Sequence, residues 1–197
     1  MKTTLMSSLV ALSALTCVAG DGPFDTYKRY GRSEFYGFAN YFGSGTEVRA
    51  NNRVAATFGS GFGGGIGFGV SAGNYLRINT ELGATGTDIK FLNGVSGKLT
   101  ALNWNVGVDY NILTTRLTPL LTGKIGTTYL GGTLSKGRVS GGSGEFDLSY
   151  GVGGGVRWDI TDHFSVKAVY LANWIDMKGS SEASLFHTFT VGVGYTF

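Results

Sequence analysis

Residues 102–112 alternate strictly between apolar and polar side chains. One face of this segment carries Leu102, Trp104, Val106, Val108, Tyr110 and Ile112, and the other carries Asn103, Asn105, Gly107, Asp109 and Asn111. A period of two is typical of a strand, because successive side chains point to opposite faces of a sheet. The segment is longer than the roughly 5–6 residues of an ordinary globular strand and matches the roughly 9–11 that a tilted strand needs to cross a bilayer. It therefore indicates a membrane-crossing strand.

The same period recurs along the rest of the chain. It is clear in 58–70, 146–160 and 185–197 and weaker in 75–86, 117–130 and 164–176, whereas 33–42 is apolar on both faces and its register stays unassigned. Short joints near 72–74, 113–116 and 161–163 alternate with longer, more polar joints near 43–57, 87–97, 131–144 and 177–184. This alternation is the layout of an outer-membrane barrel, with the turns in the periplasm and the loops outside. We therefore predict an all-β fold, an eight-stranded antiparallel transmembrane up-and-down β-barrel over residues 33–197.

Composition excludes several other classes of protein. Glycine makes up 34 of the 197 residues, 15% are charged and 13% are aromatic, which is unlike a disordered chain. The glycines do not recur at every third residue, which excludes collagen, and the single cysteine, Cys17, excludes a disulfide scaffold. After residue 20 no apolar run approaches the roughly 18 residues of a membrane-spanning helix. A net charge of +3 without a dense basic cluster argues against nucleic acid as a partner, and we interpret Lys28, Arg29 and Arg32 as a solvated tail.

Residues 1–20 have the pattern of a cleaved secretory signal peptide. Lys2 precedes an apolar stretch, and residues 18–20 supply the small side chains of a cleavage site, so that cleavage removes Cys17. The alternative is a lipid-modified Cys17, but Leu15 lies two residues before the cysteine, whereas a lipoprotein signal normally has its leucine three residues before it. Residues 21–32 then form a short periplasmic N-terminal segment ahead of the barrel.

The two faces of the predicted strands differ in composition, and this difference indicates which face meets lipid. A soluble eight-stranded barrel such as a lipocalin places its apolar side chains inside, and periodicity alone does not decide between the two arrangements. The apolar faces of this chain are broad and aromatic, whereas the other faces are rich in Gly, Ser, Thr and Asn, which suits a narrow lumen. The strand ends carry Tyr110, Trp158, Phe164 and Tyr195 on the short-turn side and Phe58, Tyr129, Phe146 and Trp174 on the long-loop side. Two such aromatic girdles are typical of a barrel that meets both membrane interfaces, so we predict that the apolar faces contact lipid.

This orientation turns seven charged residues toward the lumen: Arg77, Glu81, Asp109, Lys124, Arg157, Asp159 and Lys167. Counted from the nearest short turn, all but Lys124 fall in the periplasmic half. Because buried charges are costly unless they pair, we predict a mixed-sign layer of ion pairs that closes the lumen. The alternate glycines from Gly59 to Gly69 leave space on one wall for long side chains from the opposite wall. A wetter lumen with loosely paired charges is the alternative.

Two motifs suggest chemistry but are better explained by the strands that contain them. Gly59, Gly61 and Gly64 match a dinucleotide-binding fingerprint by spacing, but glycine continues at every second residue and the strand runs on through the motif. His187 falls on the lipid-facing register near the outer rim, and Ser184 lies off that face, so the histidine lacks a matching nucleophile. Without a cysteine in the mature chain or a histidine pair at ligand spacing, we expect no metal, no cofactor and no catalysis.

Here the chain resembles a known family. Its last seven residues place Val191, Val193, Tyr195 and Phe197 at alternate positions, which resembles the C-terminal signal that outer-membrane barrels present to the bacterial barrel-assembly machinery. The alternate glycines of 58–70 resemble the second strand of the small OmpA-, OmpX- and opacity-protein-like barrels. The resemblance to these small eight-stranded outer-membrane barrels covers residues 33–197.

The resemblance implies a monomer in the outer membrane of a Gram-negative-type bacterium, in contact with outer-membrane lipids and lipopolysaccharide. It also implies that Tyr195 and Phe197 form an assembly signal for the barrel-assembly machinery. No site motif of the family matches a position in this chain, so we expect a structural or surface-interaction role with a surface ligand that the sequence does not identify. Two alternatives stay open: a narrow porin-like channel for small solutes, and a rim enzyme acting on lipid A, for which His187 is the residue to check.

Overall fold

The computed structural model describes residue 24 and residues 26–43, 47–50, 53–91, 96–134, 146–176 and 183–197. None of these residues forms a helix long and apolar enough to cross a membrane. The strands are β1 (Ser33–Phe42), β2 (Glu47–Ala50), β3 (Arg53–Ser71), β4 (Leu76–Phe91), β5 (Ser96–Asn111), β6 (Leu117–Leu134), β7 (Phe146–Asp159), β8 (Phe164–Asp176) and β9 (Ser184–Thr196). The predicted signal peptide and parts of the predicted long loops lie outside the described residues.

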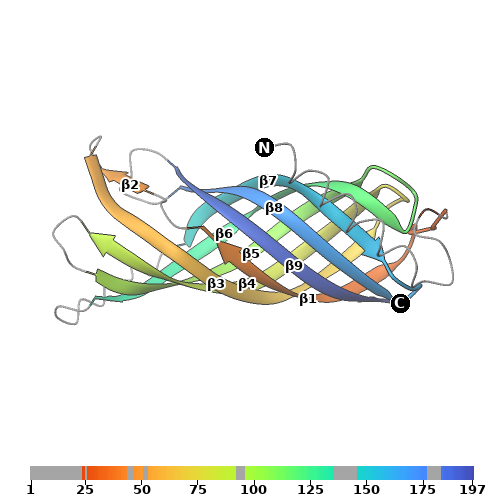
Figure 1. The fold of residues 1–197 in the computed structure, drawn as a ribbon, viewed down its shortest axis with the longest axis horizontal. Helices are drawn as coiled ribbons and strands as arrows, with labels where there is room; N and C mark the ends of the chain where they lie inside the picture. The colour runs from red at the N-terminus through yellow and green to blue at the C-terminus, as the bar shows by residue number, and fades with distance from the viewer. Residues whose placement is uncertain are drawn as a thin grey trace, which may run out of the picture.

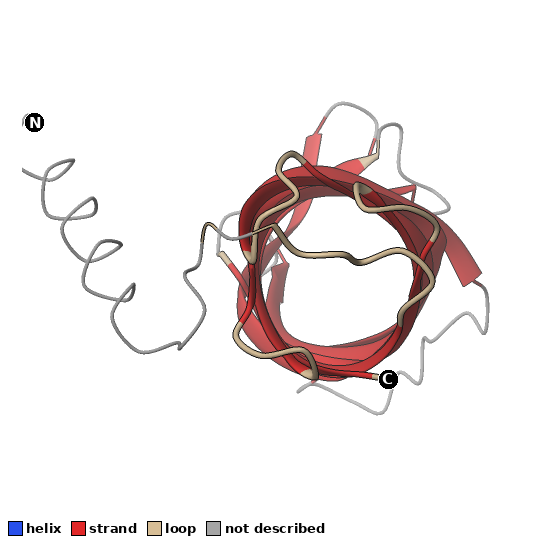
Figure 2. Ribbon diagram, turned by 90° about the vertical axis from the view of Figure 1, so that its right-hand side faces the viewer, coloured by secondary structure: helices blue, strands red, loops and turns tan. Residues whose placement is uncertain are grey.

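Eight of these strands close into an up-and-down barrel. Each pairs antiparallel with its neighbours in the order β1-β9-β8-β7-β6-β5-β4-β3, and β1 also pairs with β3, which closes the sheet. At this closure Glu34 of β1 lies opposite Thr196 of β9 on one side and Gly69 of β3 on the other. Figure 1 shows the tilted strands from the side, and Figure 2 looks along the barrel. The predicted eight-stranded antiparallel barrel is confirmed.

The remaining strand, β2, extends the sheet at the long-loop end (Figure 1). It pairs only with the first residues of β3, from Glu47 opposite Thr57 to Ala50 opposite Arg53. Part of the segment 43–57, predicted as a longer, more polar joint, therefore forms β2 and the start of β3, which prolong the wall of the barrel.

Several strands run further toward the long-loop end than the sequence predicted. β3 has 19 residues, and β4 and β5 have 16 each. In these extensions the polarity of the two faces is reversed: Ile89 of β4 is buried inside the barrel, whereas its neighbours Asp88 and Lys90 are exposed. The apolar outer band of such a barrel is only about 25 Å tall, and above it the outward face meets water. A prediction that relies on apolar outward faces therefore places the ends of these strands too early.

Within the band, the apolar faces point outward as predicted. Phe62 is 72% exposed, Ile125 57% and Trp104 55%, whereas the charged residues Arg77 and Asp109 are each 2% exposed. This is the reverse of a soluble barrel, and it leaves the lumen as the polar interior of the fold.

Candidate functional site

The lumen is where charged side chains gather. All seven residues predicted to face it do so, from β4 to β8, and five of them are almost completely buried: Arg77, Glu81, Asp109, Arg157 and Asp159. Their contacts join strands that are not neighbours in the sheet.

Two lysines reach carboxylates on other strands. Lys167 Nζ of β8 donates a hydrogen bond to Asp109 Oδ2 of β5 at 3.0 Å, and Lys124 Nζ of β6 donates to Glu81 Oε2 of β4 at 2.7 Å. Lys167 Nζ also lies 4.0 Å from Glu81 Oε1. These ion pairs cross the lumen and connect separate parts of its wall.

A second group of charges centres on Arg157 of β7. Its Nη2 lies 2.8 Å from Asp159 Oδ1 and also forms an ion pair with Glu34 of β1. Glu34 is 5% exposed, and its Oε1 accepts a hydrogen bond from the Ser165 hydroxyl at 3.1 Å. Glu34 is not among the predicted lumen residues because the alternation in 33–42 did not fix a register. The signal was present, since a carboxylate is costly in lipid and Glu34 shares its face with the polar Asn40.

Tyr36 of β1, also missed, lies between the two groups. Its hydroxyl donates to Glu81 Oε1 at 2.9 Å. The Arg77 guanidinium lies 4.9 Å from the centre of its ring, and Lys167 Nζ lies 5.1 Å from it. Arg77 Nη1 is 3.2 Å from Glu34 Oε2, but no nitrogen of this guanidinium has a hydrogen-bond partner among the described residues. Arg77 is therefore held by fewer contacts than Arg157.

Tyr36 and Arg77 occupy the space that glycines of β3 leave open. A Cβ atom added to Gly67 would collide with the Tyr36 ring, and one added to Gly69 would collide with the Arg77 guanidinium. The prediction that side chains from the opposite wall fill this space is wrong, because β1 and β4 are the strands adjacent to β3. Tyr36 lies directly opposite Gly67 in the β1–β3 pair, so the Tyr36 ring covers the position where Gly67 has no side chain.

Residues 26–32, which we call the strap, cross the mouth of the barrel at the short-turn end. In Figure 2 this tan segment runs across the opening. Tyr27 N–H donates to Thr114 O at 2.6 Å, and Gly31 N–H donates to Ser71 O at 3.0 Å. The strap thus joins the turn between β5 and β6 to the end of β3.

Arg29 anchors the strap to the lumen and is only 2% exposed. Its Nε donates to Asp159 Oδ2 at 2.8 Å, and its Nη1 and Nη2 donate to the carbonyl oxygens of Leu113 and Thr115 at 3.2 and 2.5 Å. Burial lowers the pKa of the Arg29 guanidinium, and the attraction of Asp159 acts in the opposite direction. The interpretation of Arg29 as part of a solvated tail is therefore wrong, although Lys28 beside it is exposed.

Tyr27 of the strap is surrounded by guanidinium groups. Those of Arg29, Arg32 and Arg116 lie 5.3, 4.8 and 4.8 Å from the centre of its ring. Burial raises the pKa of the Tyr27 hydroxyl, which accepts a hydrogen bond from Arg32 Nη1 at 2.5 Å. Arg32 is therefore also bound within the mouth of the barrel and is not part of a free tail.

The connected charges of the lumen and strap form one set, which we call the lumen network. Its cations are Arg29, Arg77, Lys124, Arg157 and Lys167, and its anions are Glu34, Glu81, Asp109 and Asp159. Two of these nine residues, Glu34 and Arg29, lie outside the predicted set. They are the residues that connect β1 and the N-terminal segment to the other strands.

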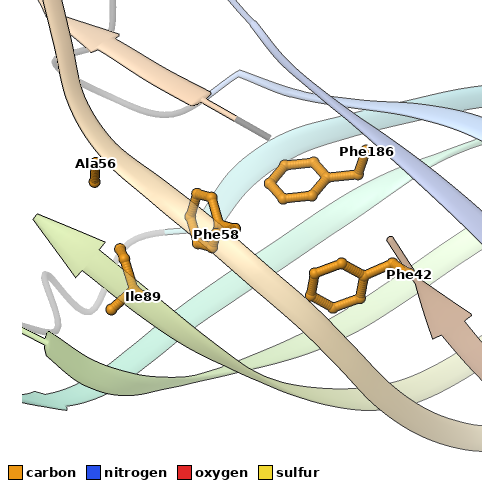
Figure 3. Close-up of a cluster of buried hydrophobic side chains, with 5 residues drawn as sticks. All are labelled: Phe42, Ala56, Phe58, Ile89 and Phe186. Carbon is orange, nitrogen blue, oxygen red and sulfur yellow. The ribbon is translucent and has the colours of Figure 1, made fainter. Parts of the chain in front are cut away.

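Toward the long-loop end the lumen also contains an apolar group of side chains. Phe42, Ala56, Phe58, Ile89 and Phe186 pack there as a group that we call the aromatic cluster (Figure 3). The Phe186 ring centre lies 5.9 Å from that of Phe42 and 5.2 Å from that of Phe58.

The placement of Phe58 in the outer aromatic girdle is wrong, since it is 3% exposed and faces inward. The β3–β4 register shifts between Phe58 and Gly61, and such a bulge turns the residues beyond it to the other face of the strand. The lumen therefore contains large aromatic side chains, although the sequence predicted a lumen lined mainly by small residues.

His187 lies on the outward face of β9, where its Nδ1 is 2.6 Å from the Tyr170 hydroxyl. Ser184 is 4% exposed and faces the other side of the strand. The serine nearest in sequence therefore does not form a nucleophile–base pair with His187.

At the other end of β9, Tyr195 and Phe197 are 47% and 66% exposed. The Tyr195 ring stacks on His163 and meets Phe164 edge-on, with ring centres 5.6 and 5.4 Å apart. The two residues lie at the short-turn end of the barrel, beside the start of β8.

The sequence matches the model of the outer membrane protein beta-barrel domain over residues 4–197. The chain belongs to this family. Barrels of the outer membrane typically have short periplasmic turns and longer external loops. A search of the curated proteins found no match.

Solved structures show the same outer-membrane barrel fold. Neisserial surface protein A (NspA) is 20% identical, with a TM-score of 0.55 over 83% of this chain and 97% of that one. The N-terminal barrel of Pseudomonas aeruginosa OprF is 15% identical, with a TM-score of 0.52 over 85% and 98%. Ail of Yersinia pestis, solved with the heparin analogue sucrose octasulfate, is 16% identical, with a TM-score of 0.52 over 85% and 99%. At these identities the likeness shows the fold alone.

Proposed function

We propose that this barrel is a non-catalytic protein of the outer membrane with a structural or surface-interaction role, and that its lumen is closed to ions. The observation that carries the proposal is the lumen network, which ties β1 to β4 and β7, β4 to β6 and β8, and the strap to β7. An ion on its way through would have to separate these buried pairs, and leaving a buried charge unpaired is strongly unfavourable.

The two ends of the lumen add to this barrier. The strap is bound across the periplasmic mouth by backbone hydrogen bonds and by Arg29. The aromatic cluster narrows the outer half, and an apolar constriction resists the passage of hydrated ions. Together these features favour a closed barrel over the alternative of a narrow porin-like channel.

Conductance in a planar bilayer tests the proposal. We expect no stable open level for the wild-type barrel and brief openings for Arg157→Ala, which breaks the network at its centre. Lys90→Ala, which removes an exposed charge near the outer rim, serves as the control and should behave as wild type. Steady open channels in the wild-type protein would instead support the channel function.

The absence of catalysis is part of the same proposal and is supported by the contacts of His187, whose ring nitrogen faces a tyrosine. Lipid A isolated from cells that express the barrel should have an unchanged mass. A mass shift that disappears with His187→Ala would establish the rim enzyme instead.

Export and partners complete the proposal. Residues 1–20 direct export and are cleaved, the mature chain inserts as a monomer, and the barrel-assembly machinery recognises Tyr195 and Phe197 during insertion. The outward apolar side chains then contact membrane lipid, and the outer rim contacts lipopolysaccharide. The exposed position of both aromatic residues at the end of β9 supports a role in recognition.

A further inference from the structure

Between the lumen network and the aromatic cluster, the lumen contains a cavity of about 110 Å³. All eight strands of the barrel contribute to its lining. Its floor includes the Lys124–Glu81 ion pair, and its roof includes the phenyl rings of Phe42, Phe58 and Phe186 (Figure 3). One end of the cavity is therefore apolar and the other end carries charges that are already paired.

Amides and hydroxyls line the walls between floor and roof. The Thr128 hydroxyl donates to Asn103 Oδ1 at 2.8 Å, and the Ser149 hydroxyl donates to Asn105 Oδ1 at 3.3 Å. Both amide oxygens are thus occupied, whereas within the described residues neither amide nitrogen donates to an acceptor. Asn103 and Asn105 line the cavity and are only partly buried, so their N–H groups are available to a molecule inside it.

The two ends of the cavity require different chemistry from its content. Water can accept hydrogen bonds from the Asn103 and Asn105 amides, but it finds no partner on the phenyl rings of the roof. A short apolar group covers those rings favourably, because it removes apolar surface from water. An ion would lose its hydration and gain only neutral partners, since Lys124 and Glu81 already neutralise each other.

Size sets a further limit on the ligand. The cavity is somewhat smaller than the roughly 150 Å³ engineered cavity that binds benzene in another protein. We infer that the outer half of the lumen is a binding site for a small uncharged molecule with a hydrogen-bond acceptor at one end and a short apolar group at the other. The acceptor faces Asn103 and Asn105, and the apolar group faces the aromatic cluster.

Propionamide is a suitable probe, because it joins a carboxamide to an ethyl group and dissolves in water rather than in detergent. We expect a saturable NMR titration of the refolded barrel in deuterated micelles, with intermolecular contacts from the ethyl protons to the rings of Phe42, Phe58 and Phe186. Propionate and propylammonium have the same size but carry a charge, and each should bind about tenfold more weakly or worse.

Matched variants separate the cavity from the rest of the barrel. Ala101→Phe fills the cavity from β5 and should weaken binding about tenfold or more, whereas Ala84→Phe on the lipid-facing side of β4 should leave it unchanged. Asn103→Leu removes a donor and should weaken binding about fivefold. Should Ala101→Phe fail to fold, Ala101→Leu serves the same purpose with a smaller side chain.

Three results would overturn the inference. Ring contacts from bound water but none from propionamide would show a hydrated cavity without a ligand site. Equal binding to wild type and to the folded cavity-filling variant would place the probe in the micelle or on the outer surface. Binding of propionate as strong as that of propionamide would show that the site does not discriminate against a charged ligand.

Discussion

At the scale of single residues, Arg157 and Arg77 show how differently two buried arginines can be bound. Arg157 makes ion pairs with both Asp159 and Glu34, whereas Arg77 approaches Glu34 without a hydrogen bond. The loss of either arginine would balance the one excess cation of the lumen network, but the loss of Arg157 leaves two carboxylates with fewer partners and the loss of Arg77 leaves one.

We therefore predict that Arg157→Met lowers the free energy of unfolding by about 3 kcal/mol, as expected when one partner of a buried ion pair is removed. Arg77→Met, the matched change, should lower it by about 1 kcal/mol or less, since no hydrogen bond is lost. Urea unfolding of the refolded barrel, followed by tryptophan fluorescence, measures both values. An equal decrease in the free energy of unfolding for the two variants would contradict the weaker contacts described for Arg77.

Gly67 provides a second prediction at this scale. A methyl group at this position meets the Tyr36 ring, so Gly67→Ala should cost about 1–3 kcal/mol of unfolding free energy, the usual cost of overpacking. Gly86→Ala is the control, because a Cβ there meets nothing within 4 Å, and it should change stability by less than about 0.5 kcal/mol. The same urea titration compares them, and a neutral Gly67→Ala would show that Tyr36 moves aside without cost.

At the scale of elements, the strap behaves as a part of the barrel although it forms no strand of it. Arg29→Ala should lower the free energy of unfolding by about 2 kcal/mol, because it removes charged hydrogen bonds to Asp159 and to two carbonyl oxygens. Lys28→Ala, one residue away and exposed, should change it by less than about 0.5 kcal/mol. An Arg29→Ala midpoint no lower than that of Lys28→Ala would show that the strap contributes nothing to stability.

The end of β9 carries a prediction about assembly. Deletion of Phe197 should lower the amount of folded protein in the outer membrane several-fold while the chain still reaches the periplasm, because the deletion removes part of the proposed recognition signal and leaves the proposed export signal intact. Phe164→Ala is the control, since it removes another exposed aromatic residue that contacts Tyr195 at the same end. Cell fractionation with blotting measures both. An equal or smaller loss for the Phe197 deletion would leave only an interfacial role for that residue.

At the scale of the whole molecule, closure of the sheet is the main source of resistance to unfolding. Eight strands pair in a closed ring, so within the membrane band the described part of the barrel has no open sheet edge that exposes unpaired backbone groups to lipid or detergent. The purified protein should therefore migrate differently on a denaturing gel before and after boiling. Identical migration of the two samples, together with a helical circular dichroism spectrum, would contradict the fold.

The sequence by itself determined the number and direction of the barrel strands and, in the strands that alternate clearly, the face that meets lipid. The membrane imposes one environment on each outward face, so most strands repeat the same local pattern, as residues 102–112 do most clearly, whereas 33–42 is apolar on both faces. The seven charged residues predicted to face the lumen were found by the same alternation, because a charge in lipid is too costly to occur by chance.

Only the tertiary structure decided the inward position of Phe58, the contacts of Glu34 and the binding of Arg29. The inward position of Phe58 depends on a bulge in the β3–β4 pair, and the contacts of Glu34 form because it lies on the strand that closes the barrel. Arg29 meets Asp159 across 130 residues of sequence. The alternation of apolar and polar side chains along a strand depends only on the environment at its two faces. This alternation does not predict which distant segment a residue will contact. Such contacts are fixed only when the sheet closes and brings the two ends of the barrel chain to the same mouth of the barrel.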